Sequence, residues 1–213
     1  MAAPSGPLSG LLPDTLRELS EDDIRRRLRP SASTPPAAPR FTPPPRIAAV
    51  LVPLYRMAGE WHMLFTERSE EVADHKGQVS FPGGQSHPQD ADVATTALRE
   101  THEEIGLDPS AVRVLGLLEP MLTITNFWVT PVVGAFDWPQ AFHLAPVEVR
   151  DVFGTPLRWL ADASHMEWME GKHPLTGEHL ITAVYAPYEG HTIWGATARI
   201  VLQFLEALNL GAG

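Results

Sequence analysis

The chain has 213 residues, 44% of them hydrophobic and 20% charged, so it can bury a core of ordinary size and is not disordered as a whole. Its 16 basic and 26 acidic side chains give a net charge of −10, which argues against binding nucleic acid or a membrane through the overall field. The absence of cysteine excludes disulfides, thiolate nucleophiles, zinc ribbons and iron–sulfur clusters. No apolar run approaches the roughly 18 residues that span a bilayer, and no basic segment precedes an apolar run at the start. We therefore expect a soluble cytoplasmic protein.

Proline is concentrated at the beginning, with 10 of the 21 prolines in the first 46 residues. Within residues 1–45 the sequence predicts one helix over 14–28, with Asp14 or Ser20 as its N-cap, followed by an extended linker. This arm is either solvated or it covers the substrate or exchanges between the subunits of a homodimer, and the sequence leaves these alternatives open. The folded domain is expected over residues 46–213.

Strands and helices are mixed in that domain without a regular strand–helix–strand rhythm. A hairpin is predicted over 47–55 and 61–66, around the turn at Ala58 and Gly59. Further strands are predicted over 112–118, 128–136, 166–168 and 180–186. Helices are predicted over 91–105, 146–153 and 196–208. The expected architecture is a mixed sheet with helices packed against it.

Three carboxylates mark the most informative helix. Glu100, Glu103 and Glu104 are spaced i, i+3 and i+4, so they share one helix face. Like charges so placed repel one another, and a cation among them would relieve the repulsion. Oxygen ligands without His or Cys favour Mg²⁺ or Mn²⁺, and Mg²⁺ commonly bridges carboxylates to substrate phosphates. Such a run alone is also typical of a solvated helix face.

The surrounding residues favour the metal-binding interpretation. Gly83 and Gly84 precede the helix, where glycine lets the backbone turn sharply and approach a ligand. With Arg99, the acids and Gly106, the segment from Gly84 to Leu107 resembles the Nudix box, G-x5-E-x7-R-E-U-x-E-E-x-G-U, where U is aliphatic. Three departures are visible: Asp90 replaces the first glutamate, one extra residue separates it from Arg99, and Thr101 replaces an aliphatic residue.

A second motif resembles that of the Nudix coenzyme A pyrophosphatases, L-L-T-x-R-[SA]-x3-R-x3-G-x3-F-P-G-G. Residues 63–69 open it, Gly77 falls in place, and Phe81-Pro82-Gly83-Gly84 closes it, whereas Ala73 stands where the pattern has arginine. The resemblance implies a Nudix-like α/β/α sandwich of the α+β class with a mixed sheet. It also implies hydrolysis of the diphosphate of coenzyme A or its thioesters, giving 3′-phosphoadenosine 5′-phosphate and 4′-phosphopantetheine.

Roles follow for the box residues. We expect Glu100 and Glu104, one turn apart, to hold the principal Mg²⁺ or Mn²⁺, with Glu103 contributing directly or through water. Arg99 is expected to orient the acids or brace the loop. Glu148 is a candidate general base, with solvation at a helix N-terminus as its alternative role.

The substrate-binding candidates lie mainly ahead of the box: Thr66, Arg68, Ser69, His75, Lys76, Gly83 and Gly84. Arg68 is the best candidate for the 3′-phosphate because a guanidinium grips phosphate in a bidentate way, with a salt bridge to Glu67 or Glu70 as the rival. Phe127, Trp128 and Trp194 either stack on adenine or belong to the core. Two other functions stay open: a Nudix hydrolase of another diphosphate such as ADP-ribose, and a non-catalytic nucleotide sensor.

Overall fold

A computed structural model describes residues 13–28, 44–69, 77–172, 177 and 179–209. Eight strands form the central sheet: β1 (Arg46–Met57), β2 (Glu60–Arg68), β3 (Val79–Ser80), β4 (Gly83–Gln85), β5 (Arg113–Leu117), β6 (Met121–Leu122), β7 (Phe127–Ala135) and β8 (Val149–Pro156). A separate hairpin contains β9 (Met166–Lys172) and β10 (His179–Tyr185). The helices are α1 (Pro13–Glu18), α2 (Glu21–Arg27), α3 (Val93–Ile105), α4 (Leu157–Leu160) and α5 (Gly195–Asn209), with short 3-10 turns at Pro109–Ala111 and Ala163–His165.

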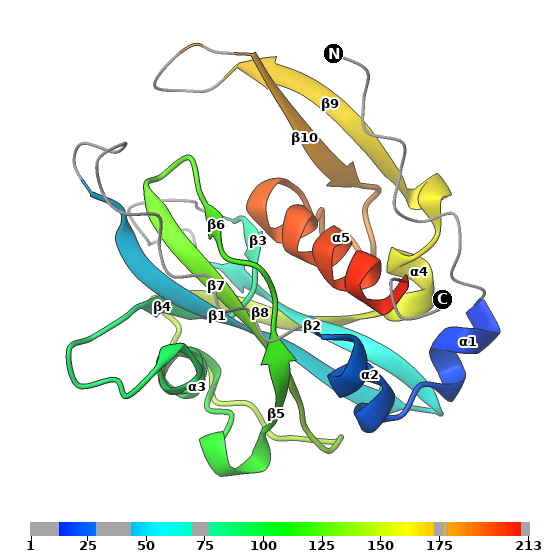
Figure 1. The fold of residues 1–213 in the computed structure, drawn as a ribbon, viewed down its shortest axis with the longest axis horizontal. Helices are drawn as coiled ribbons and strands as arrows, with labels where there is room; N and C mark the ends of the chain where they lie inside the picture. Colours follow the sequence, from blue (N-terminus) through cyan, green and yellow to red (C-terminus); the bar gives the residue numbers. More distant parts are fainter. Residues whose placement is uncertain (1–12, 29–43, 70–76, 173–176, 178, 210–213) are drawn as a thin grey trace.

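The central sheet is mixed, as the sequence predicts. Its strands follow the order β3-β2-β1-β7-β5, with β4 paired to β1, β6 to β7 and β8 to β2. The β1–β7 pair is parallel, whereas the hairpin pair β1–β2 and the pair β2–β8 are antiparallel. Helix α3 covers one face, and α5 lies on the other beneath the β9–β10 hairpin (Figure 1). The predicted sandwich is confirmed.

Alternation along β1 explains why the sheet carries a core on each face. Leu51 packs with Ala97 and Ile105 of α3, whereas the next residue, Val52, belongs to the cluster that contains Phe204 of α5. Successive strand side chains point to opposite faces, so an apolar run such as β1 serves both layers. The predicted β1–β2 hairpin is confirmed, with Ala58 and Gly59 at φ 51° and 80° in its turn.

Helix α3 ends at the predicted glycine, Gly106, and begins at Val93 instead of the predicted residue 91. The Asp92 carboxylate caps the N-terminus by accepting a hydrogen bond of 2.7 Å from the Thr95 N–H. Gly106 ends the helix at φ 73°, a left-handed conformation that glycine adopts without a Cβ penalty. These two ends fix which residues of α3 face β4, and therefore where its carboxylates lie.

The predicted helix over 14–28 is wrong as a single helix, because the chain forms α1 and α2 with a break before Ser20. The Ser20 hydroxyl accepts from the Asp23 N–H, and the Asp23 carboxylate accepts from the Ser20 N–H, so a capping box starts a new helix. A solvated arm is also wrong for this stretch. Leu16, Leu19 and Ile24 are buried, and the Trp61 Nε1–H donates to the Leu19 carbonyl.

The predicted helix over 146–153 is wrong, because residues 149–156 form β8. The apolar positions Val149, Val152 and Phe153 have helical spacing, but the segment pairs with β2 over its whole length. Phe153 lies opposite Phe65, with ring centroids 5.5 Å apart. Pairing with a distant strand thus overrides the local pattern.

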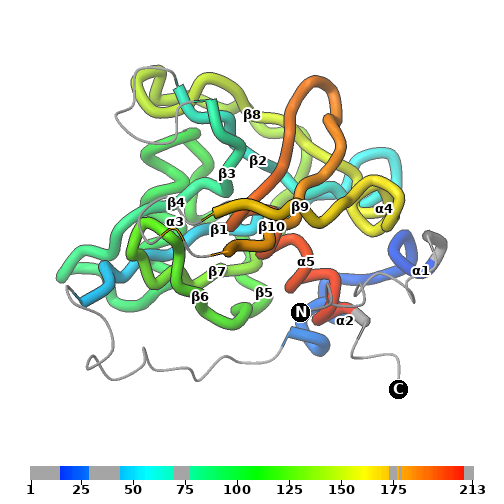
Figure 2. Tube along the Cα trace, turned by 90° about the horizontal axis from the view of Figure 1, so that it is seen from above, coloured from blue at the N-terminus to red at the C-terminus, as the bar shows by residue number. Residues whose placement is uncertain are grey.

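The C-terminal elements cover the face of the sheet opposite α3 (Figure 1). The predicted strands at β9 and β10 and the predicted closing helix at α5 are confirmed. Strands β9 and β10 and helix α5 lie on the same side of the sheet (Figure 1), and α2 lies beside the end of α5 (Figure 2). None of the helices in the described part of the chain has the length and apolar character that a bilayer crossing requires.

Candidate functional site

Helix α3 and strand β4 bring two of the predicted acids against the glycine pair. The Gly83 N–H donates to Oε2 of Glu104 over 3.1 Å. A Cβ placed on Gly84 would lie 2.4 Å from Oε2 of Glu100, so a side chain there would occupy the position of this carboxylate. Gly83 therefore binds Glu104 through a hydrogen bond, and Gly84 leaves room for the Glu100 carboxylate because it has no side chain.

Glu104 is the most perturbed acid in this arrangement. Its side chain is buried, and this burial raises its pKa from 4.5 to about 7. The Gly83 N–H and the charge of Arg68 act in the opposite direction, whereas the charges of Glu148 and Glu100 raise the pKa further. Three carboxylates thus influence one another around a buried position where a cation would favour the charged form.

Glu103 is placed differently from the other two box acids. Its side chain is 57% exposed, and Oε2 accepts from Nη1 of Arg99 over 3.2 Å. The same Nη1 donates to Oε1 of Glu100 over 2.8 Å. The structure therefore brings Glu100 and Glu104 to the glycine pair and directs Glu103 toward the arginine.

Arg99 also binds Asp90, the residue that departs from the box. Two donors of the guanidinium reach the two carboxylate oxygens over 3.0 and 2.9 Å. Nη2 of Arg99 also donates to the Gln85 carbonyl over 3.2 Å, which ties β4 to the helix. Asp90 further accepts from the His87 N–H and the Thr96 hydroxyl, both over 2.9 Å. Sequence reasoning missed this pairing, although an acid at a box position usually held by glutamate is the signal that indicates it.

The Asp90–Arg99 pair gives a prediction about stability. Hydrogen bonding from Arg99 holds the pKa of Asp90 well below 3.8, so the pair stabilises the fold above that pH and less as the pH falls below it. Asp90→Asn should lower the free energy of unfolding at pH 7, and the difference from wild type should shrink at acidic pH. Urea unfolding at several pH values measures this, with Asp22→Asn, which changes an exposed residue of α2, as control. Equal stability of Asp90→Asn and wild type at pH 7 would contradict the assignment.

Arg68 lies at the end of β2, on the α3 side of the sheet. Its charge acts on Glu104, and its Nε is buried without a hydrogen-bond partner in the described structure. The alternative salt bridge to Glu67 is not formed, because Glu67 pairs with Arg150 and His191. Glu70 lies outside the described residues. Arg68 therefore keeps a buried donor available close to the carboxylates.

Two neighbours of Arg68 are also buried. The Thr66 hydroxyl donates to the Ser80 carbonyl over 3.1 Å, which links β2 to β3. Ser69 is also buried, and its N–H donates to the Glu148 carbonyl over 2.9 Å. Glu148 itself is exposed, in the turn that leads into β8 and not at a helix N-terminus.

Several other candidates stand apart from this group. His75, Lys76 and Ala73 lie outside the described residues. The Arg46 guanidinium lies over the ring of Phe127, with its Cζ 3.8 Å from the ring centroid. The indole Nε1 of Trp128 is buried without a partner in the described structure, and Trp194 is 41% exposed.

The donor set fits a divalent cation of the hard-oxygen class. Glu100 and Glu104 offer carboxylate oxygens and no softer ligand, which suits Mg²⁺ or Mn²⁺. Burial raises the pKa of Glu104 and so disfavours its charged form. A cation there would favour that form.

Comparison with known proteins agrees with this geometry. Residues 44–186 match the NUDIX domain family. The uncharacterized Nudix hydrolase NudL of Escherichia coli O1:K1 is 38% identical over 92% of this chain and 97% of its own length. NudL of Yersinia enterocolitica is 38% identical over 76% of this chain and 82% of its own length.

The chain also matches solved structures. A NUDIX hydrolase from Alicyclobacillus acidocaldarius has a TM-score of 0.48 and 21% identity, over 79% of this chain and 94% of that chain. An Ap4A hydrolase from C. elegans has a TM-score of 0.46 and 22% identity, over 52% of this chain and 80% of that chain. On the family match and the NudL relatives, the chain belongs to the Nudix hydrolase family.

Proposed function

We propose that this Nudix hydrolase cleaves the diphosphate of coenzyme A and its thioesters, giving 3′-phosphoadenosine 5′-phosphate and 4′-phosphopantetheine or its acyl form. The observation that carries a diphosphatase site is the buried Glu104 beside Glu100, held by Gly83 and Gly84 and facing the charge of Arg68. The coenzyme A assignment is supported by the motif that runs from Met63 to Gly84 ahead of the box.

In this proposal Glu100 and Glu104 would hold a Mg²⁺ or Mn²⁺ ion, with Glu103 contributing directly or through water. When bound, the cation would neutralise charge on the diphosphate and make the attacking water more acidic. Arg99 fixes the relative position of β4 and α3 through Gln85 and Asp90.

The protein's own groups then account for the proton and the phosphates. Glu148, whose charge reaches Glu104, is the proposed acceptor of the proton from the attacking water. The water oxygen forms a bond to one phosphorus in line, and the bridging oxygen leaves with the other phosphoryl group. The buried Nε–H of Arg68 has no partner in the described structure, and we propose that it donates to a substrate phosphate. The proposed acceptor is the 3′-phosphate, which coenzyme A has and its 3′-dephospho form lacks.

Arg68 can be tested by comparing two substrates. A hydrogen bond to a charged group contributes about 1.5–3 kcal/mol, or roughly 10–100-fold in kcat/KM. Arg68→Gln should therefore reduce kcat/KM for coenzyme A by about that factor more than for 3′-dephospho-coenzyme A. Arg25→Gln, which changes an exposed residue of α2, is the matched control and should change kcat/KM for neither substrate.

Product analysis with both substrates and ADP-ribose tests the function itself. Release of 3′-phosphoadenosine 5′-phosphate, with coenzyme A turned over faster than ADP-ribose, is the expected result. Preferred hydrolysis of ADP-ribose would overturn the assignment of coenzyme A as substrate, but it would still support a diphosphatase activity. An unchanged ratio between coenzyme A and its dephospho form in Arg68→Gln would show that Arg68 supports Glu104 without reading the 3′-phosphate.

A further inference from the structure

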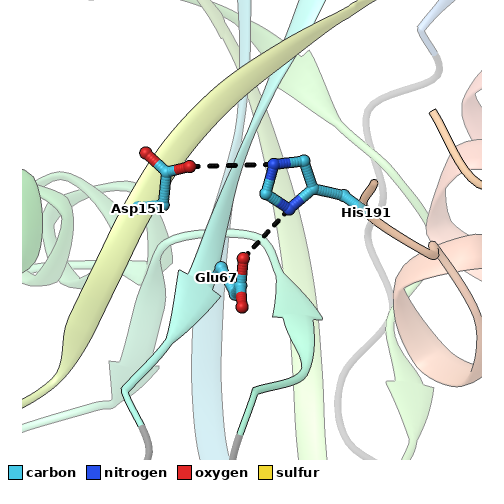
Figure 3. Close-up of side chains that lie close together, drawn as sticks. All are labelled: Glu67, Asp151 and His191. Atoms are coloured by element: carbon cyan, nitrogen blue, oxygen red, sulfur yellow. Dashed lines mark ion pairs between the residues drawn. The ribbon is translucent and has the colours of Figure 1, made fainter. Parts of the chain in front are cut away.

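A second group of metal-ligating side chains lies on the sheet face opposite the box. Glu67 pairs with His191, whose ring stacks on Phe153, and Phe153 belongs to the core cluster that contains the buried residues of α5, away from α3. On β8, Asp151 is the direct strand partner of Glu67. His191 reaches both from the loop between β10 and α5, and one ligand atom from each residue lies within 4.8 Å of the others (Figure 3).

The two carboxylates need a positive partner. Like charges at directly opposed positions of paired strands destabilise a sheet. In this structure the imidazole lies between them, with Nδ1 3.0 Å from Oε2 of Glu67 and Nε2 3.7 Å from Oδ2 of Asp151. Arg150 compensates only part of the charge, because its Nη1 pairs with the other oxygen of Glu67, Oε1, over 3.0 Å. Oε2 of Glu67 and the Asp151 carboxylate therefore stay directed toward the histidine.

The position of His191 is fixed by the surrounding fold. Its ring stacks on Phe153 with a centroid distance of 3.9 Å and an interplanar angle of 5°. Its backbone N–H and carbonyl both bond Tyr188 over 2.9 Å, which closes the turn that carries it. The side chains of His191 and Glu67 are only 15% and 14% exposed, whereas Asp151 is 55% exposed. His191 and Glu67 are thus held in place by the fold, whereas Asp151 is open to solvent.

The donor set differs from that of the box. One imidazole nitrogen with two carboxylate oxygens suits zinc and other first-row transition metals, whereas Mg²⁺ favours oxygen ligands and retained waters. Ligands around a tetrahedral Zn²⁺ are roughly 3.3 Å apart for bonds of about 2.0–2.1 Å. Nδ1 of His191 and Oε2 of Glu67 are 3.0 Å apart, close to that value. Asp151 faces the other ring nitrogen, Nε2, at 3.7 Å, so its exposed carboxylate must turn toward Nδ1 to bind the same ion.

We propose that Glu67, Asp151 and His191 bind a first-row transition-metal ion, best represented by Zn²⁺, at a site separate from the box carboxylates. Three protein ligands leave a fourth position for water. Such an ion would tie β2 and β8 to the turn before α5. The proposal does not depend on the substrate of the enzyme.

Calorimetric titration of the full chain with Zn²⁺ in excess Mg²⁺ tests the proposal, because Mg²⁺ competes for oxygen-only sites. We expect wild type and Glu104→Gln to bind one equivalent of Zn²⁺ each at this site. His191→Gln should weaken that binding at least tenfold, since even an outer-shell partner of a metal ligand contributes 10–100-fold. His179→Gln is the matched control, because His179 faces a single carboxylate, Glu170, on exposed strands and should have no effect.

A second variant guards against misfolding of His191→Gln. Asp151→Asn changes an exposed residue and should also weaken Zn²⁺ binding, with an unchanged circular dichroism spectrum. Zn²⁺ should raise the melting temperature of wild type and not that of either variant. Equal Zn²⁺ affinity in wild type, His191→Gln and Asp151→Asn would overturn the proposal, as would Zn²⁺ binding that Glu104→Gln abolishes entirely. Loss of coenzyme A turnover in Glu104→Gln with intact Zn²⁺ binding separates the two sites.

Discussion

Glu104→Gln is expected to reduce the turnover of coenzyme A by at least about 100-fold while the protein stays folded. A metal acting as a Lewis acid supplies several kcal/mol of transition-state stabilisation, and each 1.4 kcal/mol is a factor of ten in rate. The amide keeps the shape of the side chain, and its oxygen can still accept from the Gly83 N–H. Because burial opposes the charged form of Glu104, a neutral side chain there should not destabilise the fold.

The measurement is a steady-state assay with coenzyme A and Mg²⁺ or Mn²⁺, combined with thermal unfolding of each variant. Glu206→Gln, which changes an exposed glutamate on α5, should keep wild-type turnover. Glu103→Gln should have a smaller effect than Glu104→Gln, because the Glu103 carboxylate is exposed and paired with Arg99. Wild-type turnover by Glu104→Gln would refute the assignment of the metal.

Gly84→Ala is expected to lower the turnover of coenzyme A while leaving the stability of the fold nearly unchanged. The added Cβ would meet Oε2 of Glu100 at 2.4 Å and Cδ at 2.6 Å, so it must displace that carboxylate. The displaced atoms are the end of a flexible side chain, so the backbone can stay in place. A misplacement of about 1 Å at a reacting site can reduce the rate by about 100-fold, and we expect a loss of that order with little change in the melting temperature.

Two other glycines provide the comparison. Gly83→Ala should lower stability itself, since its Cβ would lie 2.4 Å from the Ala49 carbonyl oxygen and the residue has a φ of 150°. Gly171→Ala, on β9, meets no atom within 4 Å and should change neither property. Full activity of a folded Gly84→Ala protein would show that the position of Glu100 does not matter.

The parts of the fold that sequence predicts best are those with strong local patterns. Helix α3 has a glycine stop at Gly106, and the β1–β2 hairpin has a turn between two apolar runs. Strand β8 was missed because its apolar residues have helical spacing and its identity depends on pairing with β2. The break at Ser20 was missed although the residue was a candidate N-cap, because the helix before it is short and held by burial of Leu16 and Leu19.

The candidate site shows the same division. The helical spacing of Glu100 and Glu104 places both acids on one face, and the glycine pair indicates close approach. Sequence spacing cannot show that Gly83 donates to Glu104, because that bond joins a short strand to a helix. Nor can it assemble Glu67 with His191, which meet only through the pairing of β2 with β8 and the turn before α5.

Anomalous diffraction from a crystal of the full chain soaked in Mn²⁺ would locate the ion directly. We expect a manganese peak within bonding distance of carboxylate oxygens of both Glu100 and Glu104, next to Gly83 and Gly84. A crystal in which these two carboxylates point apart and no peak lies between them would contradict this expectation.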